Sequence, residues 1–269
     1  MELRTADLMA DEDARAKMAA HEFDHEFLRT HLGDERRKAS LLGEIREAIF
    51  GAQDGLVSTL AVVSTVAGAT SERYPILVAG IASGLAGIFS MAAGEYIGSK
   101  SQREIIDAQV VDERQEVHQR PGEAEAEIAF MFEEDGLPHD RALEVARIMA
   151  EYPDVLLKTM IEKELGLTVE EGGGSPLQGA LVMGAAFALG TIPPILPHVF
   201  INGEIAVMVS VAATLGVLFG IGALKSRWTH RSWWASGFEI LVLGAIAGIV
   251  GYFFGSILPM LLGAPEVAA

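Results

Sequence analysis

The sequence contains no cysteine and has few basic residues for its size. Without cysteine the chain can form neither disulfide bonds nor thiolate metal sites. Its 20 Lys and Arg stand against 37 Asp and Glu, a formal net charge of −17. We expect no nucleic-acid partner, because an acidic protein repels phosphate. Nucleophile elbows, phosphate-binding loops and His-Glu-x-x-His motifs are also absent, so we expect neither an enzyme nor a prosthetic group.

What the sequence does have is hydrophobic residues, which make up half of the chain and gather in five long segments. A helix needs roughly 20 residues to cross about 30 Å of hydrocarbon, and each segment reaches or approaches that length. We therefore predict an all-α membrane protein with five transmembrane helices. Glycines recur in these segments at a spacing of four residues, which indicates closely packed helices. The predicted spans are 49–69, 76–97, 177–199, 205–224 and 238–262.

Lys and Arg are distributed unevenly between the predicted loops. Eight precede span one, eight lie between spans two and three, and three separate spans four and five, whereas the loop after span one has one. Because positive residues favour the cytoplasmic side, we predict a cytoplasmic N-terminus, a cytoplasmic insertion and an external C-terminus. The predicted domains are an acidic N-terminal region (1–46), spans one and two (47–98), an acidic helical insertion (99–175) and spans three to five (176–269).

Proline and glycine predict where the helices break. About four short helices are expected in the insertion, and residues 172–176 are expected to be a flexible return to the membrane. Three prolines in span three should kink or end that helix. The insertion breaks lie at Pro121, Gly136–Pro138, Pro153 and Gly166, and the prolines of span three are Pro193, Pro194 and Pro197.

Asp54 is the one charged residue within the first predicted span. A charge in mid-membrane costs at least about 2.5–3.5 kcal/mol, so it is retained where it faces water or a partner. In span two, Met91 and Glu95 lie four residues apart and share one helix face. Sulfur beside carboxylate oxygen suits Fe(II) better than Mg or Ca. These three residues are the predicted transport path. Snorkelling carboxylates and a packing methionine remain the alternatives.

Six further residues are predicted metal ligands in the insertion. Glutamates one helical turn apart form two pairs, and a methionine forms a third pair with a glutamate. Crowded carboxylates repel one another, and a bound cation relieves that repulsion. A solvated acidic helical bundle is the alternative. The pairs are Glu113 with Glu116, Glu123 with Glu127, and Met160 with Glu164.

Two other patterns lie outside the predicted spans. Glu22-x-x-His25 has the spacing found in carboxylate-bridged iron sites, with His21 beside it, but it occurs once. An amphipathic helix is the favoured interpretation there. Trp228, Trp233 and Trp234 are typical of an interfacial aromatic belt.

The order of these motifs resembles the vacuolar iron transporter family, over roughly residues 38–264. The matching stretches are DGLVSTLAVVSTVAGA in span one, SMAAGEYIGSKSQRE in span two, EKELGL at the end of the insertion, IPPILP in span three and GAIAGIVGYFFG in span five. The chain is similar to a bacterial-type member with a short N-terminal extension, which implies the bacterial inner membrane as its location.

The resemblance implies a five-span homodimer that moves Fe(II), or Mn(II), out of the cytoplasm in exchange for protons. It places Asp54 and Met91 on the ion path. It also implies capture by five residues of the insertion, which are Glu113, Glu116, Glu127, Met160 and Glu164. A membrane-anchored metal buffer or sensor without transport remains the alternative function.

The sequence departs from the family pattern at two positions. Ser83 stands where members can carry an acidic residue in span two, and Ala124 stands at a glutamate position of the insertion. Glu123 and Glu125 are the candidates to replace the missing insertion carboxylate.

Overall fold

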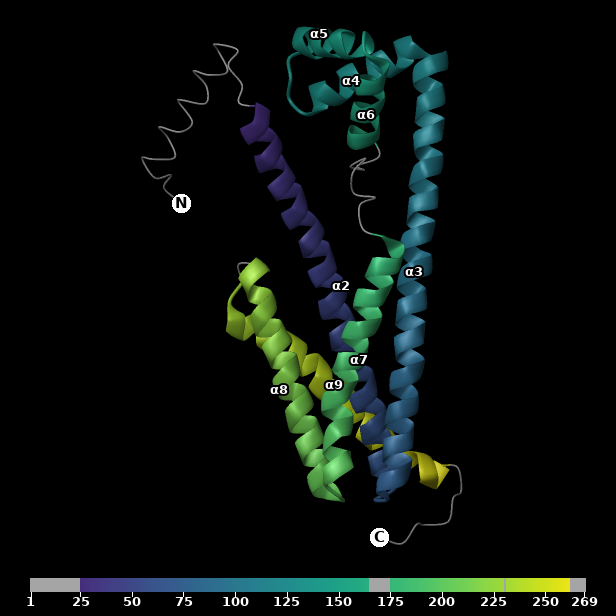
Figure 1. The fold of residues 1–269 in the computed structure, drawn as a ribbon, viewed down its shortest axis with the longest axis vertical. Helices are drawn as coiled ribbons and strands as arrows, with labels where there is room; N and C mark the ends of the chain where they lie inside the picture. Colours follow the sequence, from purple (N-terminus) through teal and green to yellow (C-terminus); the bar gives the residue numbers. More distant parts are fainter. Residues whose placement is uncertain (1–24, 165–174, 230, 262–269) are drawn as a thin grey trace, which may run out of the picture. The chain divides into compact units, whose positions relative to one another are not determined.

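A computed structural model describes residues 25–164, 175–229 and 231–261 (Figure 1). Regular structure in these ranges is entirely α-helical, and five helices are long and apolar enough to cross a membrane, which confirms the predicted fold class. In chain order the helices are α2 (His25–Ala69), α3 (Arg73–Gln119), α4 (Pro121–Glu134), α5 (His139–Ala150), α6 (Pro153–Lys163), α7 (Pro176–Phe200), α8 (Glu204–Thr229) and α9 (Trp233–Leu261).

Helices α2 and α3 are much longer than the spans predicted within them, at 45 and 47 residues. The first insertion helix is therefore not a separate element, because α3 continues without a break from span two to Gln119. The polar residues after Ile97 change what the helix faces, but no proline interrupts the backbone until Pro121. The chain divides into two compact units after Gly43, within α2, and the candidate metal centre and ion path belong to the second unit.

The remaining insertion helices begin where proline and glycine predict. Pro121 and Pro153 occupy the first turns of α4 and α6, and Pro138 precedes α5. Gly136 has φ +102°, a left-handed conformation that favours glycine and lets the chain turn between α4 and α5. The predicted breaks at Gly166 and residues 172–174 lie outside the described residues. Helices α3 to α6 share one apolar core, which includes Val117, Ala124, Ile128, Leu156, Met160 and Ile161.

The membrane helices pack through small residues. Helix α7 contacts α3 and α8, and α8 contacts α9. A Cβ added to Gly51 of α2 would lie 2.6 Å from the carbonyl oxygen of Met183 in α7. A Cβ on Gly251 of α9 would lie 2.6 Å from the carbonyl oxygen of Ala61 in α2. Helix α2 therefore packs against both α7 and α9 with backbones in close approach.

Some of the glycines at a spacing of four residues lie at contacts between helices of this chain, and others do not. Gly80, Gly84, Gly244, Gly248, Gly251 and Gly255 all have atoms of another helix within 4 Å of an added Cβ. At Gly94, Gly98, Gly216 and Gly220 an added Cβ would meet nothing within 4 Å. Spacing alone did not separate the two groups, because it does not say which face of a helix meets a neighbour.

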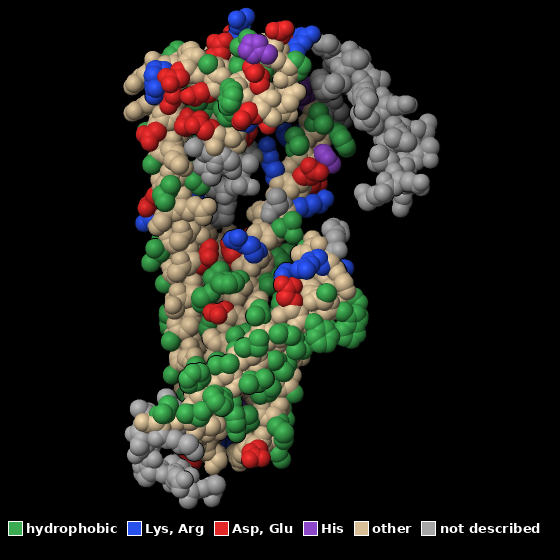
Figure 2. Space-filling model, turned by 180° about the vertical axis from the view of Figure 1, so that it is seen from behind, with side chains coloured by type: hydrophobic (Ala, Val, Ile, Leu, Met, Phe, Trp, Pro, Cys, Tyr) green, Lys and Arg blue, Asp and Glu red, His purple; other side chains and the backbone are tan. Residues whose placement is uncertain are grey.

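The prolines of span three do not break α7 at once. The helix passes through Pro193 and Pro194 and ends at Phe200, three residues after Pro197. The Ser210 hydroxyl on α8 donates a hydrogen bond of 2.6 Å to the Pro194 carbonyl, which links α8 to the proline-containing part of α7. Large apolar side chains such as Leu181 and Ile249 stay exposed on these helices, as expected of a surface that faces lipid. Figure 2 shows hydrophobic side chains gathered over the membrane helices.

Candidate metal centre and ion path

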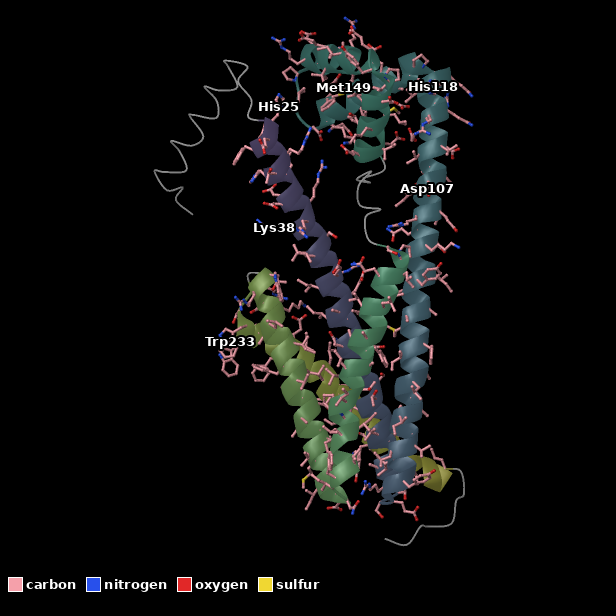
Figure 3. The ribbon with its side chains drawn as sticks, viewed as in Figure 1. His25, Lys38, Asp107, His118, Met149 and Trp233 are labelled. Atoms are coloured by element: carbon pink, nitrogen blue, oxygen red, sulfur yellow. The ribbon has the colours of Figure 1, made fainter. Side chains whose placement is uncertain are left out.

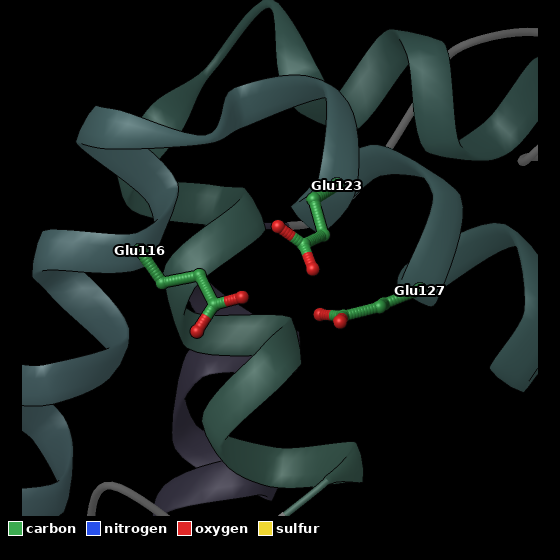
Figure 4. Close-up of side chains that lie close together, drawn as sticks. All are labelled: Glu116, Glu123 and Glu127. Atoms are coloured by element: carbon green, nitrogen blue, oxygen red, sulfur yellow. The ribbon is translucent and has the colours of Figure 1, made fainter.

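The corner between α3 and α4 brings three of the predicted glutamates together. Glu116 lies in the last turn of α3, while Glu123 and Glu127 lie one turn apart on α4. One carboxylate oxygen of each lies within 4.8 Å of the others, and the three side chains point toward a common space (Figure 4). Pro121 starts α4 directly after the corner, so the end of one helix faces the start of the next. Carboxylate oxygens in this arrangement can ligate a divalent cation.

Glu127 of the corner and the neighbouring Glu113 are both less stable as anions than an exposed carboxylate. Burial, followed by the charges of Glu164 and Glu116, raises the pKa of Glu113 above its ordinary value. Glu113 lies 16 residues beyond the apolar part of α3, and its Oε2 is buried without a hydrogen-bond partner. Burial, followed by the charges of Glu116 and Glu164, raises the pKa of Glu127 as well. A cation bound beside these carboxylates would stabilise their charged forms and oppose both effects.

Arg120 supplies the positive charge that the corner does contain, and the sequence analysis did not single it out. Its Nη2 lies 3.4 Å from Glu116 Oε2, and its Nη1 donates a hydrogen bond of 2.8 Å to Glu123 Oε2. The sequence does indicate these ion pairs, because Arg120 follows Glu116 by four residues and precedes Glu123 by three. A guanidinium bound to two carboxylates competes with a metal ion for the same oxygens.

The other insertion residues divide between the cluster and the core. Glu164 caps the C-terminal end of α6, and its charge interacts with Glu113 and Glu127. Met160 is 0% exposed and belongs to the apolar core of the insertion, so its role as a ligand stays a prediction. Ala124 is also 0% exposed and faces that core. Of its two neighbours Glu123 joins the carboxylate cluster, whereas Glu125 lies 3.7 Å from Arg147.

The predicted path residues lie on α2 and α3 and are all half-buried. Asp54 precedes Gly55, against which the backbone of Phe187 packs, and the Phe187 ring packs against Gly87 of α3. Met91 is one turn from Gly87, so Asp54 and Met91 lie at similar levels along α7. The Asp54 carbonyl accepts a hydrogen bond of 2.6 Å from the Ser58 hydroxyl. Ser83 is half-buried on α3, eight residues before Met91, and provides no carboxylate there.

Glu95 belongs to a second acidic region that the sequence analysis missed. It accepts a hydrogen bond of 2.5 Å from the Ser99 hydroxyl, and its charge interacts with that of Glu47 on α2. The Glu47 carboxylate lies against the backbone of Gly179 near the start of α7, and Glu44 accepts a hydrogen bond from Gln178. Carboxylates from α2 and α3 therefore gather where α7 begins.

The Glu22-x-x-His25 motif is mostly outside the described residues, which begin with His25 at the start of α2. His21 and Glu22 are not described, so the metal interpretation of that motif stays a prediction. Trp228, Trp233 and Trp234 are 42–53% exposed beside the ends of α8 and α9.

Comparison with known proteins identifies the family. The model of the VIT family matches residues 45–256. Vacuolar iron transporter 1 of Arabidopsis thaliana is 32% identical over 226 residues, which cover 83% of this chain and 90% of the plant protein. Vacuolar iron transporter 2 of Oryza sativa subsp. japonica is 30% identical over 231 residues, covering 85% and 94%. Vacuolar iron transporter of Toxoplasma gondii is 26% identical over 268 residues, covering 96% and 88%.

These relatives are transporters, which agrees with the expectation that the chain is not an enzyme. The five apolar helices and the match over most of the sequence show that this multi-pass membrane protein belongs to the VIT family.

Proposed function

We propose that the chain exports Fe(II), and also Mn(II), from the cytoplasm in exchange for protons. The observation that carries the proposal is the group of three glutamates, Glu116, Glu123 and Glu127, with oxygens within 4.8 Å of one another in a transporter family. The relatives named above are iron transporters, which favours iron as the substrate.

Capture of the ion begins at the corner between α3 and α4. Glu116, Glu123 and Glu127 provide the first oxygens, and the buried, unpartnered Oε2 of Glu113 provides another. Oxygen ligands alone also suit Mg and Ca, so discrimination requires softer atoms. Met160 lies in the core contacted by both α3 and α4, and rotation of its flexible side chain would add a sulfur ligand.

Passage through the membrane uses α2 and α3. Asp54 and Met91 lie at similar levels along α7, and Glu95 with Glu47 forms an acidic entrance on the predicted cytoplasmic side. A carboxylate in a span is costly unless it meets water or a cation, so its retention at position 54 favours an ion path over a simple anchor. Alternating access would expose this region to each side in turn.

Protons are the natural counter-substrate for such a path. Carboxylates bind metal in the deprotonated form, so protonation of Asp54 or Glu95 from the outside would release the ion. The uneven distribution of Lys and Arg supports a cytoplasmic insertion and an external C-terminus. A homodimer in a bacterial inner membrane completes the proposal.

Flux through proteoliposomes tests the proposal. Purified protein is reconstituted around an Fe(II)-sensitive dye, and Fe(II) is added outside under anaerobic conditions. Asp54→Ala should abolish flux and leave Fe(II) binding by the insertion intact, because the insertion does not contain position 54. Asp107→Ala removes the same charge from an exposed site on α3 and should transport as the unmodified chain does. Undiminished flux in the Asp54 variant would refute its role.

The second candidate function is a membrane-anchored metal buffer or sensor, favoured by the raised pKa values of Glu113 and Glu127 in the insertion. A buffer would bind Fe(II) but show no dye response inside the vesicle, with or without a pH gradient. A combined Glu116→Gln, Glu123→Gln and Glu127→Gln variant would then lose all metal response, whereas Asp54→Ala would lose none.

A further inference from the structure

The junction of α8 and α9 is basic in a chain that is strongly acidic overall. Residues 225–239 contain three basic side chains, Lys225, Arg227 and Arg231, and the single acidic residue Glu239, whereas the whole chain carries −17. Both flanking helices are among the five that are apolar enough to span a membrane. This cluster of positive charge therefore lies where helices leave the hydrocarbon.

An aromatic cluster lies beside these charges and has defined geometry. The ring of Phe219 on α8 lies 6.2 Å from Trp233, 5.5 Å from Trp234 and 5.8 Å from Phe238, all on α9 and all edge to face. Trp233 and Trp234 lie 4.4 Å apart. Their side chains are 49% and 53% exposed, and Trp233 points away from the two helices (Figure 3). Tryptophan in this position prefers the boundary between headgroups and acyl chains.

The three basic side chains differ in whether a neighbouring carboxylate neutralises their charge. Arg231 Nη1 lies 3.2 Å from Glu239 Oε2. Among the residues that the structure describes, Lys225 and Arg227 form no ion pair, and Arg227 is exposed while Lys225 is half-buried. Figure 2 shows Lys and Arg side chains beside a hydrophobic patch at this end of α8 and α9. The junction therefore keeps two positive charges available beside exposed rings.

We propose that this junction binds the headgroup of an anionic phospholipid from the surrounding bilayer. The indole rings of Trp233 and Trp234 lie against the glycerol region and the first acyl carbons, and Lys225 and Arg227 contact the phosphate. A zwitterionic lipid has no net charge for these cations to neutralise, so the site discriminates by headgroup charge. Each basic residue near a membrane surface contributes about fivefold to anionic lipid binding, and salt weakens the contribution. The proposal does not depend on which ion the protein transports.

The test measures lipid preference in the purified full chain. The protein in neutral detergent receives equal amounts of phosphatidylglycerol and phosphatidylcholine, and native mass spectrometry gives the ratio of the two lipids retained. The test variant carries Lys225→Gln and Arg227→Gln. A charge-matched control carries Arg141→Gln and Arg147→Gln on α5, and a second variant keeps the charges through Lys225→Arg and Arg227→Lys.

The unmodified chain should retain phosphatidylglycerol in preference. Loss of two charges should lower the ratio by roughly twenty-five-fold at low salt, whereas the charge-preserving variant and the α5 control should keep it. A thermal transition in phosphatidylcholine confirms that each variant is folded. An unchanged ratio in the neutral variant, or an equal loss in the α5 control, would overturn the proposal.

Discussion

Replacing Arg120 with glutamine should strengthen divalent metal binding by the insertion, although it removes an ion pair. The guanidinium lies 2.8 Å from Glu123 Oε2 and 3.4 Å from Glu116 Oε2, and an ion bound by the same oxygens would lie about 2.1 Å from them. The guanidinium and the ion would then be roughly 5 Å apart. A divalent and a single charge at that distance repel by about 1.7 kcal/mol in water, and by about 1 kcal/mol after salt screening.

The dielectric constant of water is used for this repulsion because the Arg120 side chain is 56% exposed. The expected gain in affinity is therefore about fivefold to fifteenfold, measured by isothermal titration of Mn(II) into the purified chain at pH 7. Arg120→Lys keeps the charge and should bind close to the unmodified value. Arg141→Gln on α5 removes a charge that pairs with Glu144 and should change affinity little.

A loss of Mn(II) affinity in Arg120→Gln would mean that Arg120 has a structural role. Arg120 is also the residue between α3 and α4, and its backbone N–H donates a hydrogen bond of 2.7 Å to the Glu116 carbonyl. If Arg120→Gln lowers Mn(II) affinity while Arg120→Lys preserves it, the guanidinium organises the carboxylates instead of competing with the ion, and the electrostatic reasoning is wrong.

Three further results are expected. Mn(II) affinity should fall as pH drops from 7 toward 5, with proton release on binding, because the pKa values of Glu113 and Glu127 are raised; calorimetry in buffers of different ionisation enthalpy checks this. A carboxyl group whose pKa is raised in the folded state destabilises the fold at pH values above that raised pKa, and has no such effect below the ordinary glutamate pKa near 4.5. Glu113→Gln should therefore raise the thermal midpoint of the metal-free protein at pH 7, and should leave it unchanged below pH 4.5. Gly190→Ala should lower the midpoint by several degrees because its Cβ would meet the Ala52 backbone, whereas Gly216→Ala should not.

The sequence predicted the membrane helices well because hydrocarbon thickness imposes a length that hydropathy reveals directly. It did not predict that α3 continues to Gln119. Hydropathy falls after Ile97 although the helix does not, and only a backbone signal such as Pro121 ends it. A boundary drawn from polarity marks where the environment changes, which here differs from where the helix ends.

The sequence predicted only part of the candidate site, because it shows spacing along one helix but not the contacts between helices. Spacing along one helix paired Glu123 with Glu127, but the sequence could not say that the turn at Pro121 brings Glu116 to face them. Spacing equally suggested Glu125 as a replacement for the missing carboxylate, and only the fold directs that residue to Arg147. Met160 carries a ligand atom in the sequence but is a core side chain in the structure, because helix packing decides which face is buried.

The most direct test of the central claim counts Fe(II) ions accumulated per chain in sealed proteoliposomes, with and without a proton gradient across the membrane. The proposed exchange predicts that accumulation rises with time far beyond the few ions the insertion can bind, and that collapsing the gradient slows it. A plateau at a small fixed number of ions per chain, identical at every gradient, would contradict transport and leave a metal-binding membrane protein.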